Sequence, residues 1–253
     1  MKTAYIVTSV INARTDRPLT YSATRTVFSA DDRLRHTIMT VASLDQICDE
    51  NSTIYLLDMS DNWQQYKSQL AYQTNLKFIS IKEEFSEIFD EVTTHANKSR
   101  CETLVMSEFL KKYKSELINY DFITKVSGRY FIDGSFNPEI FSEQNKGKVF
   151  YKKPLEFEWS DSWQYQMVDR RIIQQTNTLK QYSSVIFSWS IEYYDQFQDM
   201  FTRMTELLNQ PSMMHYDIET LSYFFTRQYS DDIIETDWIV YGWDGTNGRF
   251  LRY

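Results

Sequence analysis

The sequence has few glycines and cysteines, and it has no long run of hydrophobic residues. Its 253 residues include six glycines, none of them before Gly128. A Walker P-loop and the dinucleotide-binding fingerprint both need glycines in the first strand–helix turn, where the backbone approaches phosphate. Both motifs are therefore excluded from the N-terminal half. A nucleotide bound there would need side chains or a metal to neutralise its phosphates.

Other scarcities narrow the class of protein further. The two cysteines, Cys48 and Cys101, have a spacing that fits neither a disulfide framework nor a zinc site. The formal net charge is −8, which argues against a nucleic-acid-binding protein because phosphate contacts need surplus Lys and Arg. No apolar stretch approaches the roughly 18 residues of a membrane span, and no signal-peptide cleavage site follows the start. We therefore expect a soluble, cytoplasmic protein.

Strand and helix patterns alternate through the first half of the chain. Hydrophobic, β-branched runs predict strands at 4–11, 53–60, 76–81 and 121–132. Periodicity of 3.6 residues predicts helices at 32–49, 62–72, 83–94 and 101–117. Ser29 or Asp31 can cap the first helix. This order predicts an α/β fold with an open, mostly parallel sheet flanked by helices.

The second half is less regular. The pattern predicts strands at 148–154, 183–190 and 237–243, and helices at 191–209 and 217–229. No internal repeat or low-complexity linker divides the chain, so we expect a single domain over 1–253. Gly242, Gly245 and Gly248 lie close together and predict a mobile or tightly turned C-terminal segment.

Sheets of this kind bind ligands beyond the carboxyl ends of their strands. That rule places residues 14–25, 58–61 and 127–129 on one rim of the predicted sheet. The polar segment that follows the first strand, up to about Ala30, is too long for an ordinary strand–helix loop. We therefore expect it to be functional or partly mobile.

One segment carries a family resemblance. Residues 120–132, YDFITKVSGRYFI, resemble the strand that delivers the Asp-x-Asp motif in GT-A glycosyltransferases, with Ser127-Gly128-Arg129 in place of the acidic triplet. This form is similar to a poorly characterised set of bacterial and phage glycosyltransferases. Those proteins also carry an Arg- and Ser-containing stretch near the N-terminus, which resembles RTVFSADDRLRHT at 25–37. Further similarities are LDMS at 57–60, KSRCE at 98–102 and the helix start Ile218-Glu219.

The resemblance implies a GT-A-like fold and transfer of a hexose from a nucleoside-diphosphate sugar to a glycan or other hydroxyl acceptor. About residues 1–135 would bind the donor nucleotide, and about 136–253 would form the acceptor side. A UDP-sugar is the favoured donor. The location would be the cytoplasm, or the host cytoplasm if a phage encodes the protein.

The replaced triplet changes the expected chemistry of the donor site. Ser127 and Gly128 cannot supply metal ligands and Arg129 would repel a cation, but a guanidinium can hold phosphate oxygens with paired hydrogen bonds. We assign donor binding to Thr8, Ser9, Arg25, Arg33, Asp58, Lys98, Lys125, Ser127, Gly128 and Arg129. We assign no metal ligands, although Asp58, Asp61 and Asp133 leave Mn²⁺ or Mg²⁺ open as a cofactor.

Several of these residues have a second interpretation. The arginines can be solvated surface residues of an acidic protein. Asp58 can contact the nucleoside or form a metal pair with Asp61, which can also cap the next helix. Lys98 can pair with Glu102 one helical turn away instead of contacting the donor.

The acceptor side has its own candidates. A carboxylate must deprotonate the acceptor hydroxyl in an inverting transfer, and GT-A enzymes usually place it at the start of a late helix, which Asp217 and Glu219 resemble. Both can instead serve as helix-capping residues. Trp159, Trp163 and Trp243 can stack on an acceptor sugar, or they can belong to the core.

Two other functions remain open from the sequence. One is a non-catalytic carbohydrate- or nucleotide-sugar-binding module that kept the fold without its metal motif. The other is a nucleotidyltransferase, which would need clustered carboxylates for magnesium, and only Asp58 and Asp61 offer such a pair.

Overall fold

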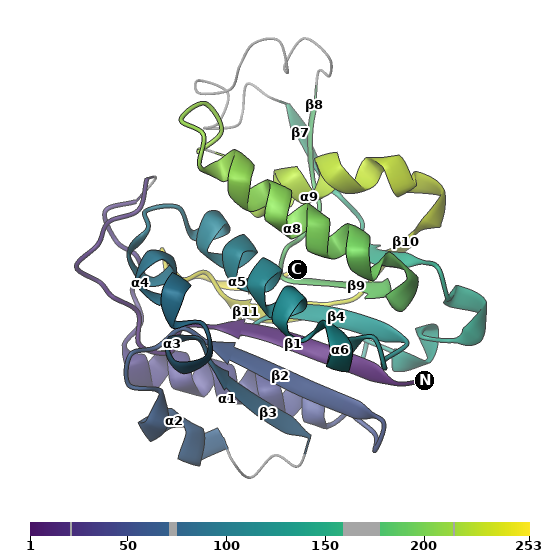
Figure 1. The fold of residues 1–253 in the computed structure, drawn as a ribbon, viewed down its shortest axis with the longest axis horizontal. Coiled ribbons are helices and arrows are strands. Elements are labelled where there is room, and N and C mark those ends of the chain that lie inside the picture. Colours follow the sequence, from purple (N-terminus) through teal and green to yellow (C-terminus); the bar gives the residue numbers. More distant parts are fainter. Residues whose placement is uncertain (21, 71–74, 159–177, 215) are drawn as a thin grey trace.

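The structure, a computed structural model, describes residues 1–20, 22–70, 75–158, 178–214 and 216–253. A seven-stranded sheet crosses its centre in the order β10-β6-β9-β4-β1-β2-β3 (Figure 1). The strands are β1 (Thr3–Ser9), β2 (Ser52–Asp58), β3 (Leu76–Ser80), β4 (Phe122–Ser127), β6 (Val149–Lys152), β9 (Ile186–Ser190) and β10 (Ile233–Thr236). All neighbours pair in parallel except β9, which is antiparallel to both β4 and β6. The predicted mostly parallel α/β sheet is confirmed.

Helices cover both faces of this sheet. On one face lie α4 (Ser86–Thr94), α5 (Lys98–Lys112), α8 (Tyr194–Leu208) and α9 (Ile218–Thr226), and on the other lie α1 (Ala30–Asp45) and α2 (Trp63–Leu70). Figure 1 shows α5 and α8 in front of the sheet and α1 behind it. Short helices α3 (Ile81–Glu84) and α6 (Lys114–Leu117) connect elements on the first face.

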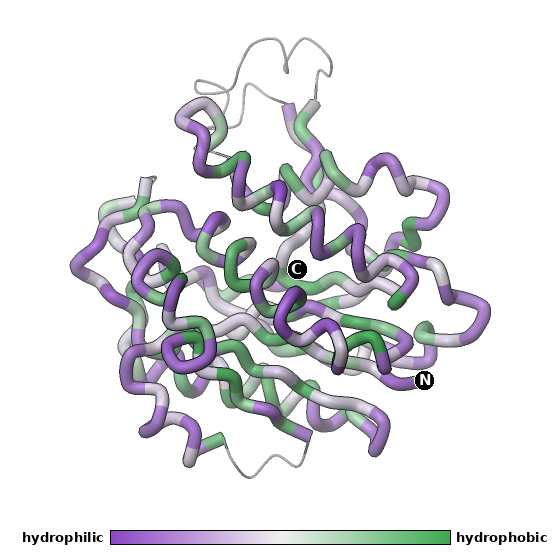
Figure 2. The backbone as a smooth tube through the Cα atoms, viewed as in Figure 1, coloured by the Kyte–Doolittle hydropathy of each residue, from purple (hydrophilic) through white to green (hydrophobic). Residues whose placement is uncertain are grey.

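Strand β1 shows why the sheet lies in the middle of the core. Successive side chains of a strand point to opposite faces. Accordingly, Ala4 and Ile6 pack beneath α5, while Tyr5 and Val7 pack against the α1 side. All seven residues of β1 are buried, as expected of a strand covered on both faces. Figure 2 shows the same pattern as hydrophobic colour along the central strands.

The parallel register brings the polar strand ends together. Ser9 at the end of β1 pairs with Asp58 at the end of β2, and Thr8 pairs with Ser127 at the end of β4. The long segment after β1 runs over this edge before α1 begins. Ser29 caps α1 in a capping box with Asp32, so the first of the two predicted caps is used.

The predicted strand over 121–132 is two strands in two sheets. β4 ends at Ser127, and β5 (Tyr130–Ile132) joins a three-stranded sheet with β11 (Val240–Trp243) and β12 (Phe250–Arg252), in the order β12-β11-β5. Gly128 allows the break, because a Cβ there would come within 2.8 Å of the Thr8 carbonyl oxygen and 3.1 Å of Ser9 Cβ. Only glycine lets the end of β4 approach β1 this closely.

Of the three C-terminal glycines, Gly245 and Gly248 lie in a tight turn, and Gly242 lies in the strand before it. This turn joins β11 (Val240–Trp243) to β12 (Phe250–Arg252). The Gly248 amide donates to the Asp244 carbonyl at 2.9 Å, and Gly248 has φ +74°. A further two-stranded ribbon pairs β7 (Leu155–Glu158) with β8 (Thr178–Gln181).

Several predicted boundaries were wrong. The helix predicted at 101–117 begins at Lys98, where Asn97 caps it, and it is broken before α6. The helix predicted at 83–94 is interrupted at Phe85, which separates α3 from α4. Across the described residues, no helix is both long and apolar enough to cross a membrane.

Candidate active site

A cavity of about 130 Å³ lies at the carboxyl ends of β1, β2 and β4. Residues from all three predicted rim segments line it, including Arg14, Arg25, Asp61 and Ser127. Helices α4 and α5 close its other side. We call this the first cavity.

The first cavity brings together eight of the ten residues predicted to bind a donor. These are Thr8, Ser9, Arg25, Arg33, Lys98, Ser127, Gly128 and Arg129. Their presence in one cavity follows from the strand register and from the long segment after β1. The structure thus assembles these residues, and their role in donor binding stays a prediction.

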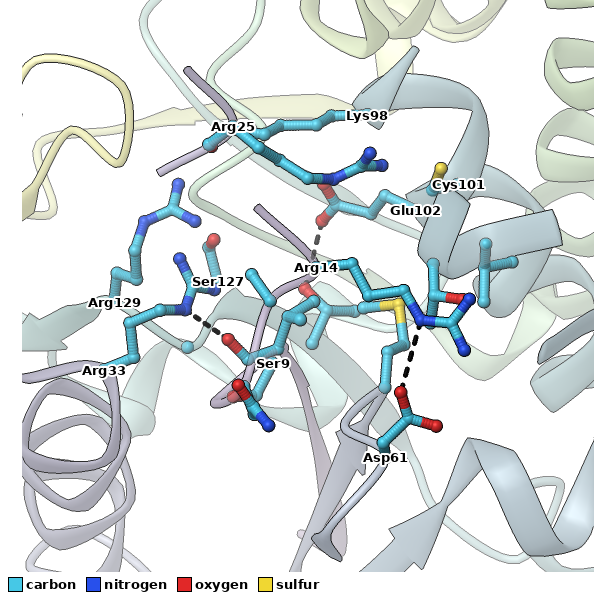
Figure 3. A pocket seen from close by; sticks show the side chains of 18 residues that line it. Ser9, Arg14, Arg25, Arg33, Asp61, Lys98, Cys101, Glu102, Ser127 and Arg129 are labelled. Atoms are coloured by element: carbon cyan, nitrogen blue, oxygen red, sulfur yellow. Dashed lines mark hydrogen bonds and ion pairs between the residues drawn. The ribbon is translucent and has the colours of Figure 1, made fainter. Parts of the chain in front are cut away.

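Four of them form a cationic cluster, defined here as Arg25, Arg33, Lys98 and Arg129. Figure 3 shows Arg33 beside Arg129, with Arg25 and Lys98 together above them. Lys98 Nζ donates to the Arg25 carbonyl at 2.5 Å, and Arg25 Nη2 donates to the His95 carbonyl at 2.6 Å. Arg25 Nη1 is buried and has no hydrogen-bond partner among the described residues.

The charges of the cationic cluster repel one another, and its Lys98 and Arg33 groups are largely buried. Burial, followed by repulsion from Arg129, Arg33 and Arg25, lowers the pKa of Lys98 to about 7. Burial and then repulsion from Arg129 lower the pKa of Arg33 to about 9. A bound anion would offset this repulsion and favour the charged forms of Lys98 and Arg33. The cluster is therefore suited to a phosphate or diphosphate ligand.

Asp58 and Lys125, the other two predicted donor residues, do not line the first cavity. Asp58 is fully buried, and its two carboxylate oxygens accept hydrogen bonds from the amides of Ile11 at 3.2 Å and Ser60 at 3.0 Å. It thus holds together the turns that follow β1 and β2. Lys125 is also fully buried, and it forms an ion pair with Glu102.

A second cavity, of about 290 Å³, adjoins the first. Lys98, Glu102, Ser127 and Arg129 line both cavities. The far wall of the second cavity comes from the start of α9 and from residues near Ser184 and Tyr253. Two ligands, one bound in each cavity, would therefore come close to each other at these four shared residues.

The predicted catalytic carboxylates both line the second cavity. Asp217 is the N-cap of α9, where it accepts a hydrogen bond from the Thr220 amide at 2.7 Å. Glu219 is half-buried and accepts a hydrogen bond from Ser184 Oγ. Burial, and secondarily the charge of Asp217, raise the pKa of Glu219 to about 7. A carboxylate with that pKa can take up a proton near neutral pH.

Comparison with known proteins rests on structure alone. No protein-family model and no curated protein matches the chain. Core-mannan synthase A from Aspergillus fumigatus, solved in its Mn/GDP form, is similar over 95% of this chain and 74% of its own, at 9% identity and a TM-score of 0.55. Mouse xyloside xylosyltransferase 1, in its apo form, is similar over 94% and 86%, at 8% identity and a TM-score of 0.53. The chain has the GT-A glycosyltransferase fold.

The GT-A fold raises the question of a metal, since one neighbour was solved with manganese. The carboxylates near the first cavity are already engaged: Asp61 pairs with Arg14 at 3.2 Å and with Lys82 at 3.3 Å. Asp133 accepts its hydrogen bonds from Ser135, in the turn after β5. Within the described ranges, no three His, Cys, Asp or Glu side chains are grouped so that they could hold a metal ion. These residues do not fit a divalent cation held by carboxylates.

The tryptophans predicted to bind an acceptor line neither cavity where the structure describes them. Trp243 stacks on His36 with ring centroids 4.1 Å apart, and Phe131 and Phe250 lie beside it on the outer face of the small sheet. Its carbonyl accepts a hydrogen bond from Arg129 Nε at 3.2 Å. Trp159 and Trp163 lie outside the described residues.

Glu102 is a residue of the site that the sequence did not identify. Its spacing allowed a pair with Lys98 as the alternative to a donor contact by Lys98, but the structure pairs Glu102 with Lys125, while Lys98 donates to the Arg25 carbonyl. Local spacing on a helix cannot reveal a partner on a neighbouring strand. The available signal was a lysine within the apolar run of β4, because a buried ammonium needs a nearby anion.

Proposed function

We propose that this protein is a glycosyltransferase that moves a hexose from a nucleoside-diphosphate sugar to a hydroxyl of a glycan or another acceptor. One observation carries the proposal: a cationic cavity adjoins a second cavity that holds the carboxylate of Glu219. The first suits the diphosphate of a donor, and the second suits a hydroxyl that must lose a proton. The GT-A fold supports the same assignment.

The donor side would work through charge. When the bond from the anomeric carbon to the diphosphate breaks, the leaving diphosphate gains negative charge, which must be stabilised. Arg25, Arg33, Lys98 and Arg129 would supply that stabilisation directly. A guanidinium group can donate two parallel hydrogen bonds to phosphate oxygens. In a metal-dependent site, a metal ion would coordinate these oxygens instead. Donor binding would then need no metal held by the protein.

The acceptor side would work through Glu219. Its carboxylate would accept the proton of the attacking hydroxyl, and its pKa of about 7 suits that role at neutral pH. Asp217 would act on Glu219 through its charge while it caps α9. Residues of about 1–135 would hold the donor, and residues of about 136–253 would form most of the acceptor side.

A thermal-shift panel tests the proposal. UDP, GDP and other nucleoside diphosphates, with their hexose conjugates, would be added with and without Mn²⁺, and release of the nucleoside diphosphate from each conjugate would be followed. A ligand that binds only the folded state increases the unfolding free energy by RT ln(1 + [L]/Kd) and thereby raises the melting temperature. We expect a diphosphate to stabilise the protein and a sugar nucleotide to be slowly hydrolysed. Stabilisation by oligosaccharides alone, with no response to any nucleotide, would instead indicate the non-catalytic binding module.

A further inference from the structure

A chain of polar contacts joins the two cavities. Glu102 on α5 lines both of them, and its side chain is 22% exposed. Thr8 Oγ1 donates to Glu102 Oε1 at 3.1 Å, and Lys125 Nζ forms an ion pair with the same oxygen. Lys125 Nζ also donates to the Ser184 carbonyl at 2.5 Å, and Ser184 Oγ donates to Glu219. These contacts form one polar network that includes Glu102, which lines both cavities, and Glu219, which lines the second cavity.

Lys125 is the centre of this network. Its side chain is fully buried in β4, where an ammonium group is costly unless an anion pairs with it. The ion pair fixes the position of the Glu102 carboxylate. A carboxylate present only to neutralise Lys125 would need no access to ligand, whereas Glu102 reaches both cavities.

The location of Glu102 matches where the reaction would take place. Arg129 and Lys98, which would hold the diphosphate, line both cavities. The anomeric carbon is joined directly to the diphosphate, so the donor sugar would begin where the cavities meet. Among the described residues, Glu102 is the acidic side chain that lines both cavities.

On the basis of the proposed glycosyl transfer, we propose that Glu102 is a catalytic carboxylate that faces the anomeric carbon of the donor sugar, and that Lys125 is its positioning residue. In the step, the bond from the anomeric carbon to the diphosphate oxygen breaks and both electrons leave with the oxygen. The acceptor oxygen bonds to the anomeric carbon, and its proton goes to Glu219. Glu102 forms no bond and stabilises the positive charge that develops on the sugar ring.

Glu102→Gln tests this role, because it keeps the size of the side chain and removes the charge. Using a set of UDP- and GDP-hexoses, we expect kcat for donor hydrolysis and for transfer to fall by about 10²–10³-fold. The Kd of the donor should stay unchanged or become tighter, since a negative charge near the diphosphate is lost. Glu108→Gln is the matched control: it lies on the same helix, pairs with Lys111 at 3.9 Å and lines neither cavity, so kcat should be unchanged.

The double variant Glu102→Gln/Lys125→Met separates catalysis from charge balance. If Glu102 served only to neutralise Lys125, removing both charges would restore turnover. We expect the double variant to fold, as judged by its melting temperature and donor affinity, and to remain as slow as Glu102→Gln. Recovery of turnover in the double variant, or wild-type turnover in Glu102→Gln, would overturn the proposal while leaving glycosyl transfer intact. A wild-type protein that binds no sugar nucleotide would overturn both.

Discussion

The guanidinium of Arg129 lies against the backbone of Gly245. A Cβ at Gly245 would come within 3.3 Å of Arg129 Cζ, and Arg129 Nε donates to the Trp243 carbonyl at 3.2 Å. The turn between β11 and β12 thus supports a charged group at the end of β4, although more than a hundred residues separate them in the chain. This support fixes Arg129 in the wall shared by the two cavities.

Arg129→Ala should weaken binding of a nucleoside diphosphate and leave binding of the nucleoside nearly unchanged. The loss of one charge-assisted contact costs about 1.5–3 kcal/mol, or about ten- to a hundredfold in Kd. Calorimetry with UDP, GDP, uridine and guanosine measures both quantities. Arg252→Ala, which removes a guanidinium over Tyr241 on the outer face of the small sheet, is the control. An equal loss for nucleoside and diphosphate would show that Arg129 acts on the fold and not on phosphate.

Binding of a diphosphate should take up a proton at pH 8. Free Lys98, with a pKa of about 7, is mostly neutral at that pH, and a bound dianion would raise its pKa and restore its charge. Affinity should therefore fall by up to about tenfold for each pH unit above 7 until the pKa of the complex is reached. Calorimetry in two buffers of different ionisation enthalpy counts the protons. Lys98→Met should abolish the uptake, and uptake that persists in this variant would assign the proton elsewhere.

Turnover should fall as the pH is lowered through about 7. Glu219 can accept the acceptor proton only when it is ionised, and its raised pKa means that it is protonated below about pH 7. The rate of transfer at saturating substrate should then decrease by about tenfold per pH unit in acid. Glu219→Gln should lose transfer at every pH while donor hydrolysis, in which water replaces the acceptor, falls less. A flat pH profile between 5 and 7 in the wild type would argue against Glu219 as the base.

Gly128→Ala should destabilise the protein. The added Cβ would lie 2.8 Å from the Thr8 carbonyl oxygen, so the ends of β1 and β4 would have to separate. Overpacking of this kind costs about 1–3 kcal/mol of unfolding free energy. Gly134→Ala is the control, because a Cβ there would meet no atom within 4 Å. Chemical denaturation measures the unfolding free energy of both variants. Equal values would show that the ends of β1 and β4 can move apart without loss of stability.

The sequence predicted the half of the fold that local patterns encode. The strands and helices over the first 117 residues were readable apart from several boundaries, because their patterns depend on neighbours along the chain. Ser29 as one of two candidate caps and the tight turn that contains Gly245 and Gly248 were readable for the same reason. The rim was predictable as well, since parallel strands place their carboxyl ends at one edge.

What could not be predicted depends on contacts between distant residues. Strand β9 pairs antiparallel between β4 and β6, and β10 adds to the edge of the sheet beside β6. The periodicity of these short segments does not indicate which strands they pair with. The partner of Glu102 was missed for the same reason, since Lys125 lies on a strand that only the folded sheet brings beside α5. Periodicity assigns a residue to an element, but it does not say which element packs next to it.

A cationic cluster that stabilises the leaving diphosphate would do the work that carboxylates and a divalent cation otherwise share. The dependence of donor binding and turnover on a metal shows whether it does. After exhaustive chelation with EDTA, donor affinity and turnover would be measured across a Mn²⁺ titration. We expect both to persist in EDTA and to change little as Mn²⁺ is added. If EDTA abolishes both and Mn²⁺ restores them, the cluster does not replace the metal, and Asp58, Asp61 and Asp133 become the residues to test.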